Sequence, residues 1–177
     1  MAVAPHTEAD RVALLLQFLV AFGNVAGRSI RRIVESTPHY LNLFAVLVGA
    51  TSKSRKGSAL SWIVRFFEKV DEAWADQRIQ SGLSSGEGLV WTLRDEMKDD
   101  QVADKRLLVI EPEFASVLRV VKRDHNTLSA ILRQAWDTGK LRIITKNDPA
   151  RATGAHVSLI GHITSEELSR DSERLRE

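Results

Sequence analysis

The chain has 177 residues, of which 44% are hydrophobic and 27% charged, values typical of a folded globular protein and far from those of a disordered one. Lysine and arginine number 25 against 23 aspartate and glutamate, and the net charge of +2 does not by itself indicate a nucleic-acid or membrane partner. The absence of cysteine excludes disulfide scaffolds, cysteine-ligated zinc, iron–sulfur clusters and cysteine nucleophiles, and it is compatible with the cytoplasm.

The apolar segment Val12 to Phe22 predicts a buried helix near the amino terminus. Thr7 or Asp10 is expected to cap it, and the Gly23-Asn24 pair to end or bend it. A bilayer span needs about 20 apolar residues, so this segment is too short, and it lacks the basic start of a signal peptide. We therefore expect no membrane segment here.

Strand-like and helix-like segments alternate along the rest of the chain. The predicted elements, in order, are a polar connector through Pro38, a strand at 41–48, a helix from Ser58 through Trp74, a helix from a Ser84–Glu87 capping box through Leu93, a strand at 107–110, helices at 114–121 and 128–136, strands at 141–145 and 156–163, and a charged helix capped by Thr164 or Ser165. The alternation predicts an α/β domain with a mainly parallel sheet, whose continuous apolar strands are covered on both faces. We divide the chain into a helical segment with its connector (1–40), a core (41–164) and a last helix (165–177).

The loop after the first strand has features of a phosphate-binding loop. It consists of Gly49, Ala50, Thr51, Ser52, Lys53, Ser54, Arg55, Lys56, Gly57 and Ser58. Such a loop needs inward backbone N–H groups, a cation for the phosphates and a hydroxyl for Mg²⁺. The usual pattern G-x-x-x-x-G-K-[ST] starts at Gly49, but Ser54 replaces the second glycine and Arg55 the lysine. In a shifted register Lys56 is the cation and Ser58 the hydroxyl. The alternative is a solvated basic loop, and this alternative is favoured when the motif is considered alone.

Two acids, Glu111 and Glu113, follow the second apolar strand. Both would project to one side if the strand continued through Pro112. One acid can then hold a Mg²⁺-bound water while the other orients an attacking water, as in P-loop ATPases. Alternatively, Glu113 lies in the first turn of a helix that Pro112 begins, where the dipole favours an acid. For a nucleotide site, we expect the loop and the acids to emerge from adjacent strands.

Other polar residues give weaker indications. His162 or Thr164, at the end of the last strand, could sense a γ-phosphate, although a structural role is commoner for a lone histidine. The five histidines do not form a metal site, because His156 and His162 would lie about 20 Å apart on one strand. No serine lies in a strained elbow with a histidine and an aspartate, so no nucleophilic triad is assigned.

Residues 119–151 hold eight cations against three acids, a local excess of five positive charges. The cations are Arg119, Lys122, Arg123, Arg133, Lys140, Arg142, Lys146 and Arg151. This excess fits contact with a phosphate backbone. A solvated face is the alternative, because few aromatic residues accompany these cations for base stacking.

Six segments together resemble an uncharacterised family of helicase-like P-loop proteins with a RecA-type core. They are LQFLVAFGN (16–24), NLF to VG (42–49), GLSSGEGL (82–89), LLVIEPEF (107–114), TL to QAWD (127–137) and AHVSLIGHIT (155–164). The likeness covers the chain roughly from Asp10 to Arg170. Members of that family are commonly encoded on phages, plasmids and integrated elements, often beside or fused to primase–polymerase domains.

The resemblance implies a RecA-like domain that binds ATP with Mg²⁺ and hydrolyses it, acting with DNA in mobile-element replication. By position it assigns the phosphate loop to residues 49–58, with Ser58 and Glu111 at the metal. Glu113 lies behind Glu111, Glu87 occupies a position where related cores can carry an acid, and His162 is a sensor. Glu87 is equally explained by its capping box.

The chain departs from the family in two ways. The loop lacks the second glycine and a clean Gly-Lys-[Ser/Thr] ending, which weakens the case for hydrolysis more than that for binding. The sequence also stops soon after Thr164, where family members continue, which suggests truncation at the carboxyl terminus. Partners implied are DNA, a primase–polymerase or a missing carboxyl-terminal half, and a second copy of the chain. The alternatives are a degenerate, non-catalytic assembly module and a basic nucleic-acid-binding domain.

Overall fold

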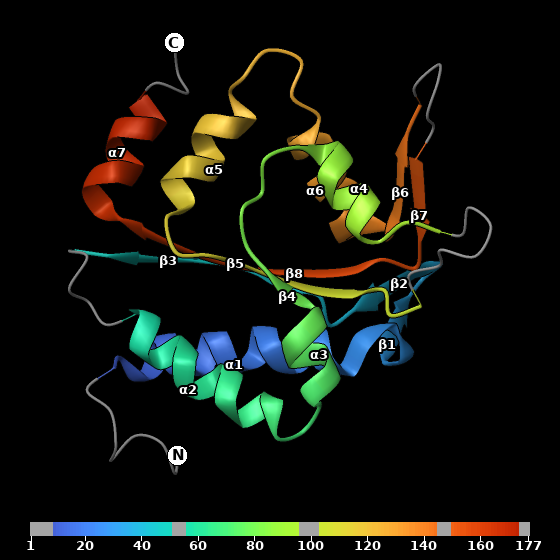
Figure 1. Cartoon of the computed structure of the whole chain (residues 1–177), viewed down its shortest axis with the longest axis horizontal. Coiled ribbons are helices and arrows are strands. Elements are labelled where there is room, and N and C mark those ends of the chain that lie inside the picture. Colours follow the sequence, from blue (N-terminus) through green and yellow to red (C-terminus); the bar gives the residue numbers. More distant parts are fainter. Residues whose placement is uncertain (1–8, 51–55, 96–102, 145–149, 174–177) are drawn as a thin grey trace.

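A four-stranded parallel sheet in the order β3-β8-β5-β4 lies between two layers of helices in the computed structural model (Figure 1). The structure describes residues 9–50, 56–95, 103–144 and 150–173, of which residues 56, 172 and 173 by their backbone. The strands are β3 (Phe44–Gly49), β4 (Ile79–Gln80), β5 (Arg106–Glu111) and β8 (His156–Thr164). The predicted α/β class with a mainly parallel sheet is confirmed.

The two helical layers come from different parts of the chain. On one face, called the α1 face, lie α1 (Arg11–Ala26), α2 (Lys56–Glu68) and α3 (Glu72–Gln77). On the other, called the α6 face, lie α4 (Gly86–Thr92), α5 (Phe114–Val121), α6 (Leu128–Asp137) and α7 (Ser165–Glu173). The predicted helix from Ser58 through Trp74 is therefore two helices, α2 and α3, and Asp71 caps the second by accepting a hydrogen bond from the Trp74 N–H.

The apolar run of β5 is explained by burial on both faces. Leu108 and Ile110 pack in the core of the α1 face with Ile63 and Phe67 of α2. Leu107 and Val109 alternate with them and pack in the core of the α6 face. Each such fully buried aliphatic side chain stabilises the fold by about 1.5–3 kcal/mol.

α1 extends further than predicted. Asp10 caps it as expected, its Oδ1 accepting hydrogen bonds of 2.9 Å from the N–H groups of Val12 and Ala13, whereas Thr7 lies outside the described residues. The predicted end at Gly23-Asn24 is wrong, because both residues are buried inside the helix. A Cβ at Gly23 would collide with the carbonyl oxygen of Leu41, so glycine lets α1 approach the chain that leads into β3.

By length and composition the segment Arg11–Ser29 could cross a membrane, with a mean hydropathy of 1.4, so the prediction that the apolar segment here is too short is wrong. In the fold, 44% of this segment is buried. Its polar residues Gln17 and Asn24 face the sheet and are fully buried. The segment therefore packs against the sheet through one face, which includes these two polar residues.

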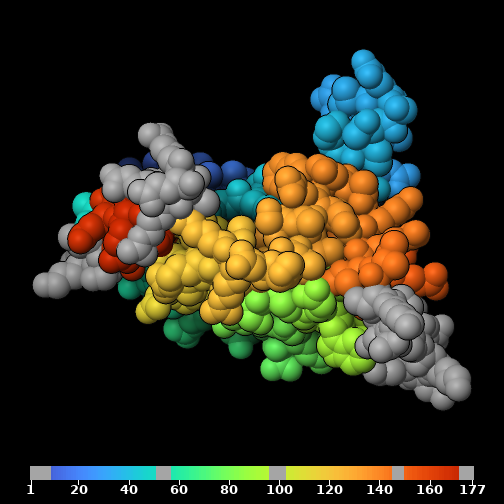
Figure 2. Space-filling model, turned by 90° about the horizontal axis from the view of Figure 1, so that it is seen from above, coloured from blue at the N-terminus to red at the C-terminus, as the bar shows by residue number. Residues whose placement is uncertain are grey.

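The polar connector that follows α1 forms a hairpin. After the short helix η2 (Gly27–Ser29), β1 (Arg31–Val34) pairs antiparallel with β2 (Thr37–Tyr40). Every residue of both strands is exposed except Tyr40, which is half-buried. Figure 2 shows this hairpin standing out from the body of the molecule.

A second hairpin precedes β8. β6 (Lys140–Ile143) pairs antiparallel with β7 (Ala150–Thr153) and packs against α4 and α6 through Leu141 and Ala152. The strand predicted at 141–145 corresponds to β6, whereas β7 was not predicted. The turn expected at 147–149 lies outside the described residues.

β3 is an edge strand and β8 lies between it and β5. The expectation that β3 and β5 are adjacent is therefore wrong. The prediction that β3 is covered on both faces is also wrong, because Val46 is 41% exposed and Val48 is 50% exposed. Since all four strands are parallel, β3 and β5 still end at the same edge of the sheet.

Candidate functional site

The carboxyl edge of the sheet has a topological switch point between β3 and β8. After β3 the chain turns to α2 on the α1 face, and after β8 it turns to α7 on the α6 face (Figure 1). Ligands of open parallel sheets bind in the crevice at such a point. Gly49 lies beside Thr164 in the register, so the strand that leads into the predicted phosphate loop borders this crevice.

The predicted phosphate loop is described in part. Thr51, Ser52, Lys53, Ser54 and Arg55 lie outside the described residues. Lys56, Gly57 and Ser58 form the first turn of α2, where free N–H groups and the helix dipole favour an anion. Gly57 and Ser58 are exposed, and a Cβ on Gly57 would meet no described atom within 4 Å. A ligand group can therefore approach this turn without displacing the described atoms.

Glu111 ends β5 and is 5% exposed. Its Oε1 accepts hydrogen bonds of 2.7 Å from the backbone N–H groups of Gly82 and Leu83. The φ of 87° at Gly82 favours glycine and turns the loop after β4 toward the carboxylate. Among the described residues, no donor reaches Oε2. One oxygen of Glu111 thus holds the loop after β4.

Glu113 does not continue the strand that ends in Glu111. β5 ends at Glu111, and Glu113 is the exposed N-cap residue of α5. Its side chain makes no capping hydrogen bond. The helix that Pro112 precedes, rather than a continued strand, therefore sets its position.

Glu87 connects two helices. Its Oε1 accepts a hydrogen bond of 2.9 Å from the Thr127 hydroxyl, which joins the first turn of α4 to the start of α6. The predicted Ser84–Glu87 capping box is wrong, because Ser85 caps α4 through a 3.0 Å hydrogen bond from the Gly88 N–H. Glu87 therefore lies on the α6 face, away from the switch point.

His162 and Thr164 both have partners inside the chain. His162 is buried toward α1, with its Nε2 3.2 Å from the Nε2 of Gln17. The Thr164 hydroxyl donates to Oε2 of Glu167 at 2.7 Å and accepts from the Glu167 N–H, a capping box that starts α7 as predicted for Thr164. The hydrogen bond from the Thr164 hydroxyl is the main cause that lowers the pKa of Glu167.

The structure brings the end of β3, which precedes the loop, and the acid to one edge of the sheet, at different depths. Because β8 separates β3 from β5, their axes are about 10 Å apart. Gly49 is level with Thr164 and Glu111 with Gly161, so the acid is about 10 Å further from the edge. A Cβ at Gly161 would lie 2.6 Å from the Phe114 ring, so glycine lets α5 pack closely over β8 here.

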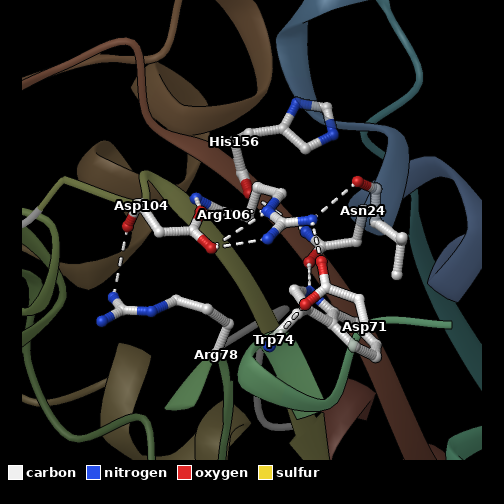
Figure 3. A network of polar contacts seen from close by, with 8 residues as sticks. Asn24, Asp71, Trp74, Arg78, Asp104, Arg106 and His156 are labelled. Carbon is white, nitrogen blue, oxygen red and sulfur yellow. Dashed lines mark hydrogen bonds and ion pairs between the residues drawn. The ribbon is translucent and has the colours of Figure 1, made fainter. Parts of the chain in front are cut away.

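A polar network at the opposite, amino end of the strands was not predicted (Figure 3). Asn24 donates to the carbonyl oxygens of Leu107 and His156, both at 3.0 Å, and its Oδ1 accepts from the Trp74 indole at 2.8 Å. Buried polar groups are expected to be paired in this way. The spacing of Gln17 and Asn24, seven residues apart in an apolar helix, is the sequence signal that indicates a buried polar face.

Arg106 extends this network to two carboxylates. Its guanidinium bonds Asp71 at 2.9 Å and Asp104 at 2.7 Å. The hydrogen bond from the Trp74 N–H and then Arg106 lower the pKa of Asp71. Burial opposes ionisation of Asp104, but the hydrogen bonds and charge of Arg106 outweigh it and lower that pKa too. These groups neutralise one another and act as a structural tie between α1, α3 and β5.

Arg28 forms a separate junction at the same end. Its Nη1 donates to the carbonyl oxygen of Ala155 and its Nη2 to that of Thr138, both at 2.9 Å. Its guanidinium lies 3.5 Å from the ring centroid of Tyr40. The side-chain hydrogen bond with Arg28 is the main cause that lowers the pKa of this tyrosine.

A comparison of the sequence with models of protein families finds no match, and a comparison with curated proteins finds none either.

Proposed function

We propose that this chain is a RecA-like P-loop domain that binds ATP with Mg²⁺ at the carboxyl edge of its sheet and hydrolyses it. In this proposal it belongs to the helicase-like family that its sequence resembles and acts in the cytoplasm with DNA in the replication of a mobile element. A primase–polymerase, further chain beyond the core or a second copy would complete its assembly.

The strand order is the observation that carries the proposal. The strand before the loop and the strand that ends in Glu111 lie on either side of β8, and all end at one edge. The switch point beside Gly49 then supports a triphosphate crossing from the first turn of α2 toward Glu111.

The described donors fit a magnesium nucleotide. Ser58 supplies an exposed hydroxyl in the first turn of α2, and Oε2 of Glu111 has no described hydrogen-bond donor. Hydroxyl and carboxylate oxygens suit Mg²⁺ beside phosphates. The metal would neutralise charge on the phosphates, while Lys56 would attract them and Glu111 would hold a water.

A non-catalytic binding module is the second candidate. Both described hydrogen bonds to Glu111 serve to hold the loop at Gly82 and Leu83. Ser54 in place of the usual glycine also departs from the sequence of active phosphate loops. Such a module would bind the nucleotide without turnover.

Binding of a fluorescent ATP analogue and Mg²⁺-dependent phosphate release test the proposal on the full chain. We expect Lys56→Ala to weaken binding about tenfold, as one lost charged contact of roughly 1.4 kcal/mol would. Glu111→Gln keeps an acceptor for Gly82 and Leu83, so it should preserve binding and reduce phosphate release roughly 100-fold. Lys69→Ala, at an exposed position after α2, is the matched control and should change neither.

The outcomes separate the candidates. Binding without turnover, with Glu111→Gln equal to the parent, would establish the non-catalytic module. No affinity for nucleotide in either the parent or Ser54→Gly would reject both.

A further inference from the structure

Two hairpins rise from the same end of the molecule, opposite the candidate nucleotide edge. β1–β2 follows α1, and β6–β7 immediately precedes β8 (Figure 1). Arg28 joins their bases, because it bonds Thr138 just before β6 and Ala155 just after β7 while it stacks on Tyr40 at the end of β2. The two hairpins are therefore held in a fixed relation by one side chain.

The outer face of β6–β7 is cationic. Lys140 and Arg142 alternate with the buried Leu141, and the register places Arg142 directly opposite Arg151. Like charges in such a pair repel each other and destabilise the ladder. Within the part of the chain that the structure describes, no carboxylate lies within salt-bridge distance of Lys140 or Arg142.

The one described carboxylate near Arg151 is largely engaged elsewhere. Asp95 Oδ2 lies 3.7 Å from the Arg151 Nε. Asp95 also accepts hydrogen bonds of 3.1 Å from Lys105, and of 2.9 Å and 2.6 Å from the N–H and hydroxyl of Thr153. The Arg151 side chain is accordingly 70% exposed.

The β1–β2 hairpin carries arginines on both faces. Arg31 and Arg32 are consecutive in one strand, so their side chains point to opposite faces of the ribbon. The apolar Ile33 is 61% exposed, and Val34 is 49% exposed. Across the described residues of the two hairpins, Arg31, Arg32, Lys140, Arg142 and Arg151 are opposed by the single acid Glu35, five cations against one.

We propose that these hairpins bind double-stranded DNA, with the β1–β2 ribbon in the major groove and β6–β7 on the neighbouring phosphate backbone. A flat anionic surface would contact only one face of β1–β2 and so only one of the two arginines. A DNA groove has phosphates on both walls, so Arg31 can contact a phosphate on one wall and Arg32 a phosphate on the other. The major groove of B-DNA is about 12 Å wide and admits a two-stranded ribbon, while that of double-stranded RNA is too narrow. This inference names a partner for the helicase-like domain proposed above, but its physical basis does not include nucleotide binding.

Fluorescence anisotropy with a labelled DNA duplex of about 20 base pairs tests the proposal in nucleotide-free buffer over a range of salt concentrations. Arg32→Gln and Arg142→Gln each remove an exposed cation with no described ion pair, one from each hairpin. Each should weaken binding several-fold and reduce the slope of log Kobs against log salt by about 0.9, and the double variant by about 1.8. Arg65→Gln with Lys69→Gln, at exposed positions on α2 and just after it, removes the same charge and should change affinity less than twofold.

Specificity for the duplex is measured against single-stranded DNA, double-stranded RNA and vesicles with anionic headgroups. Duplex DNA should bind more tightly than each of these. Absence of duplex binding, a salt-independent affinity, an equal loss in the control pair, or tighter binding of RNA or vesicles would overturn the proposal. Because no nucleotide is present, failure of the ATP proposal would leave these results unaffected.

Discussion

Asn24 connects parts of the chain that are far apart in the sequence. Its side chain bonds the backbone of β5 and β8 and the indole of Trp74 in α3. A buried polar group left without a partner costs about 1–3 kcal/mol of stability. Breaking one of these hydrogen bonds therefore destabilises the fold by more than the bond's net contribution to stability. The polar residues inside α1 therefore determine how the helix seats on the sheet.

His156 makes stability depend on pH near neutrality. It is 1% exposed, its Nε2 lies 2.8 Å from the carbonyl oxygen of Gly23, and burial lowers its pKa. The unfolded histidine binds a proton below about pH 6.5 while the folded one stays neutral, so the free energy of unfolding falls as pH falls below that value. Above it, this group has no effect on the pH dependence.

We expect His156→Gln to remove up to about 1.4 kcal/mol per pH unit of this slope between pH 6.5 and the lowered pKa. Urea unfolding at several pH values measures it. His39→Gln, at an exposed position of β2, is the control and should retain the slope of the parent. An identical slope in the parent and His156→Gln would contradict the assignment.

Tyr40 reports on the Arg28 junction, because it is the one tyrosine of the sequence. Hydrogen bonding with Arg28 lowers the pKa of its phenol from the ordinary value of 10.0. At pH 7 the phenol is neutral in both the folded and the unfolded protein. The lowered pKa therefore raises the free energy of unfolding only as pH rises through that pKa. Absorbance at 295 nm follows the titration.

Arg28→Lys keeps the charge but loses the planar guanidinium, and we expect it to raise the phenol pKa toward 10.0. Arg32→Gln, on the opposite face of the ribbon, should leave it unchanged. If both variants titrate like the parent, Arg28 does not control Tyr40.

At the scale of elements, α4 and α6 meet through a position that requires glycine. A Cβ at Gly86 would lie 2.7 Å from Cγ1 of Ile131 and 2.9 Å from the carbonyl oxygen of Thr127. We expect Gly86→Ala to separate the helices and lower the free energy of unfolding by about 1–3 kcal/mol. Thermal or urea unfolding measures the change.

Gly57→Ala is the control for a glycine in a helix without such contact. Its Cβ would meet no described atom within 4 Å, so the substitution should be neutral or stabilise the fold by up to about 1 kcal/mol. Equal losses at both positions would show that helix packing is not the cause.

Elements that bury a core were predictable from the sequence, whereas exposed ones were not. β5 is a continuous apolar run because both of its faces are covered, and Asp10 and Thr164 are caps because their oxygens accept backbone N–H groups. β1–β2 escaped prediction because it has no buried face and so no periodicity. Similarly, Trp74 follows the helical spacing of α2 although Asp71 starts a new helix.

The candidate site was predictable as strand ends but not as contacts. The apolar runs before Gly49 and Glu111 mark the ends of parallel strands, which must share an edge. The position of β8 between them depends on long-range pairing that has no local signature in the chain. For the same reason, the sequence could not show that Glu111 holds the loop after β4.

At the scale of the whole molecule, the two proposed ligands occupy opposite ends of the sheet. The nucleotide would lie at the carboxyl ends of the strands and the duplex at the hairpins near their amino ends. We expect each ligand to raise the melting temperature on its own. At a hundredfold excess over its Kd, each should add about 2.7 kcal/mol to the free energy of unfolding. Calorimetric scans with one or both ligands measure this.

The two stabilisations should add when both ligands are present, because no described residue contacts both ends. At the same nucleotide concentration Lys56→Ala, with its tenfold weaker binding, should lower the first stabilisation to about 1.4 kcal/mol and preserve the second. A shared loss of both effects in that variant would indicate one site for the two ligands.

The outer edge of β3 has a consequence for handling the protein. Among the described strands none pairs there, and residues 41–49 contain no charged side chain and no proline. Natural sheets suppress aggregation by placing lysine or proline on such an edge, and this one lacks these gatekeepers. The isolated chain should thus form concentration-dependent aggregates by sheet extension, and Val46→Lys should delay them, as light scattering would show.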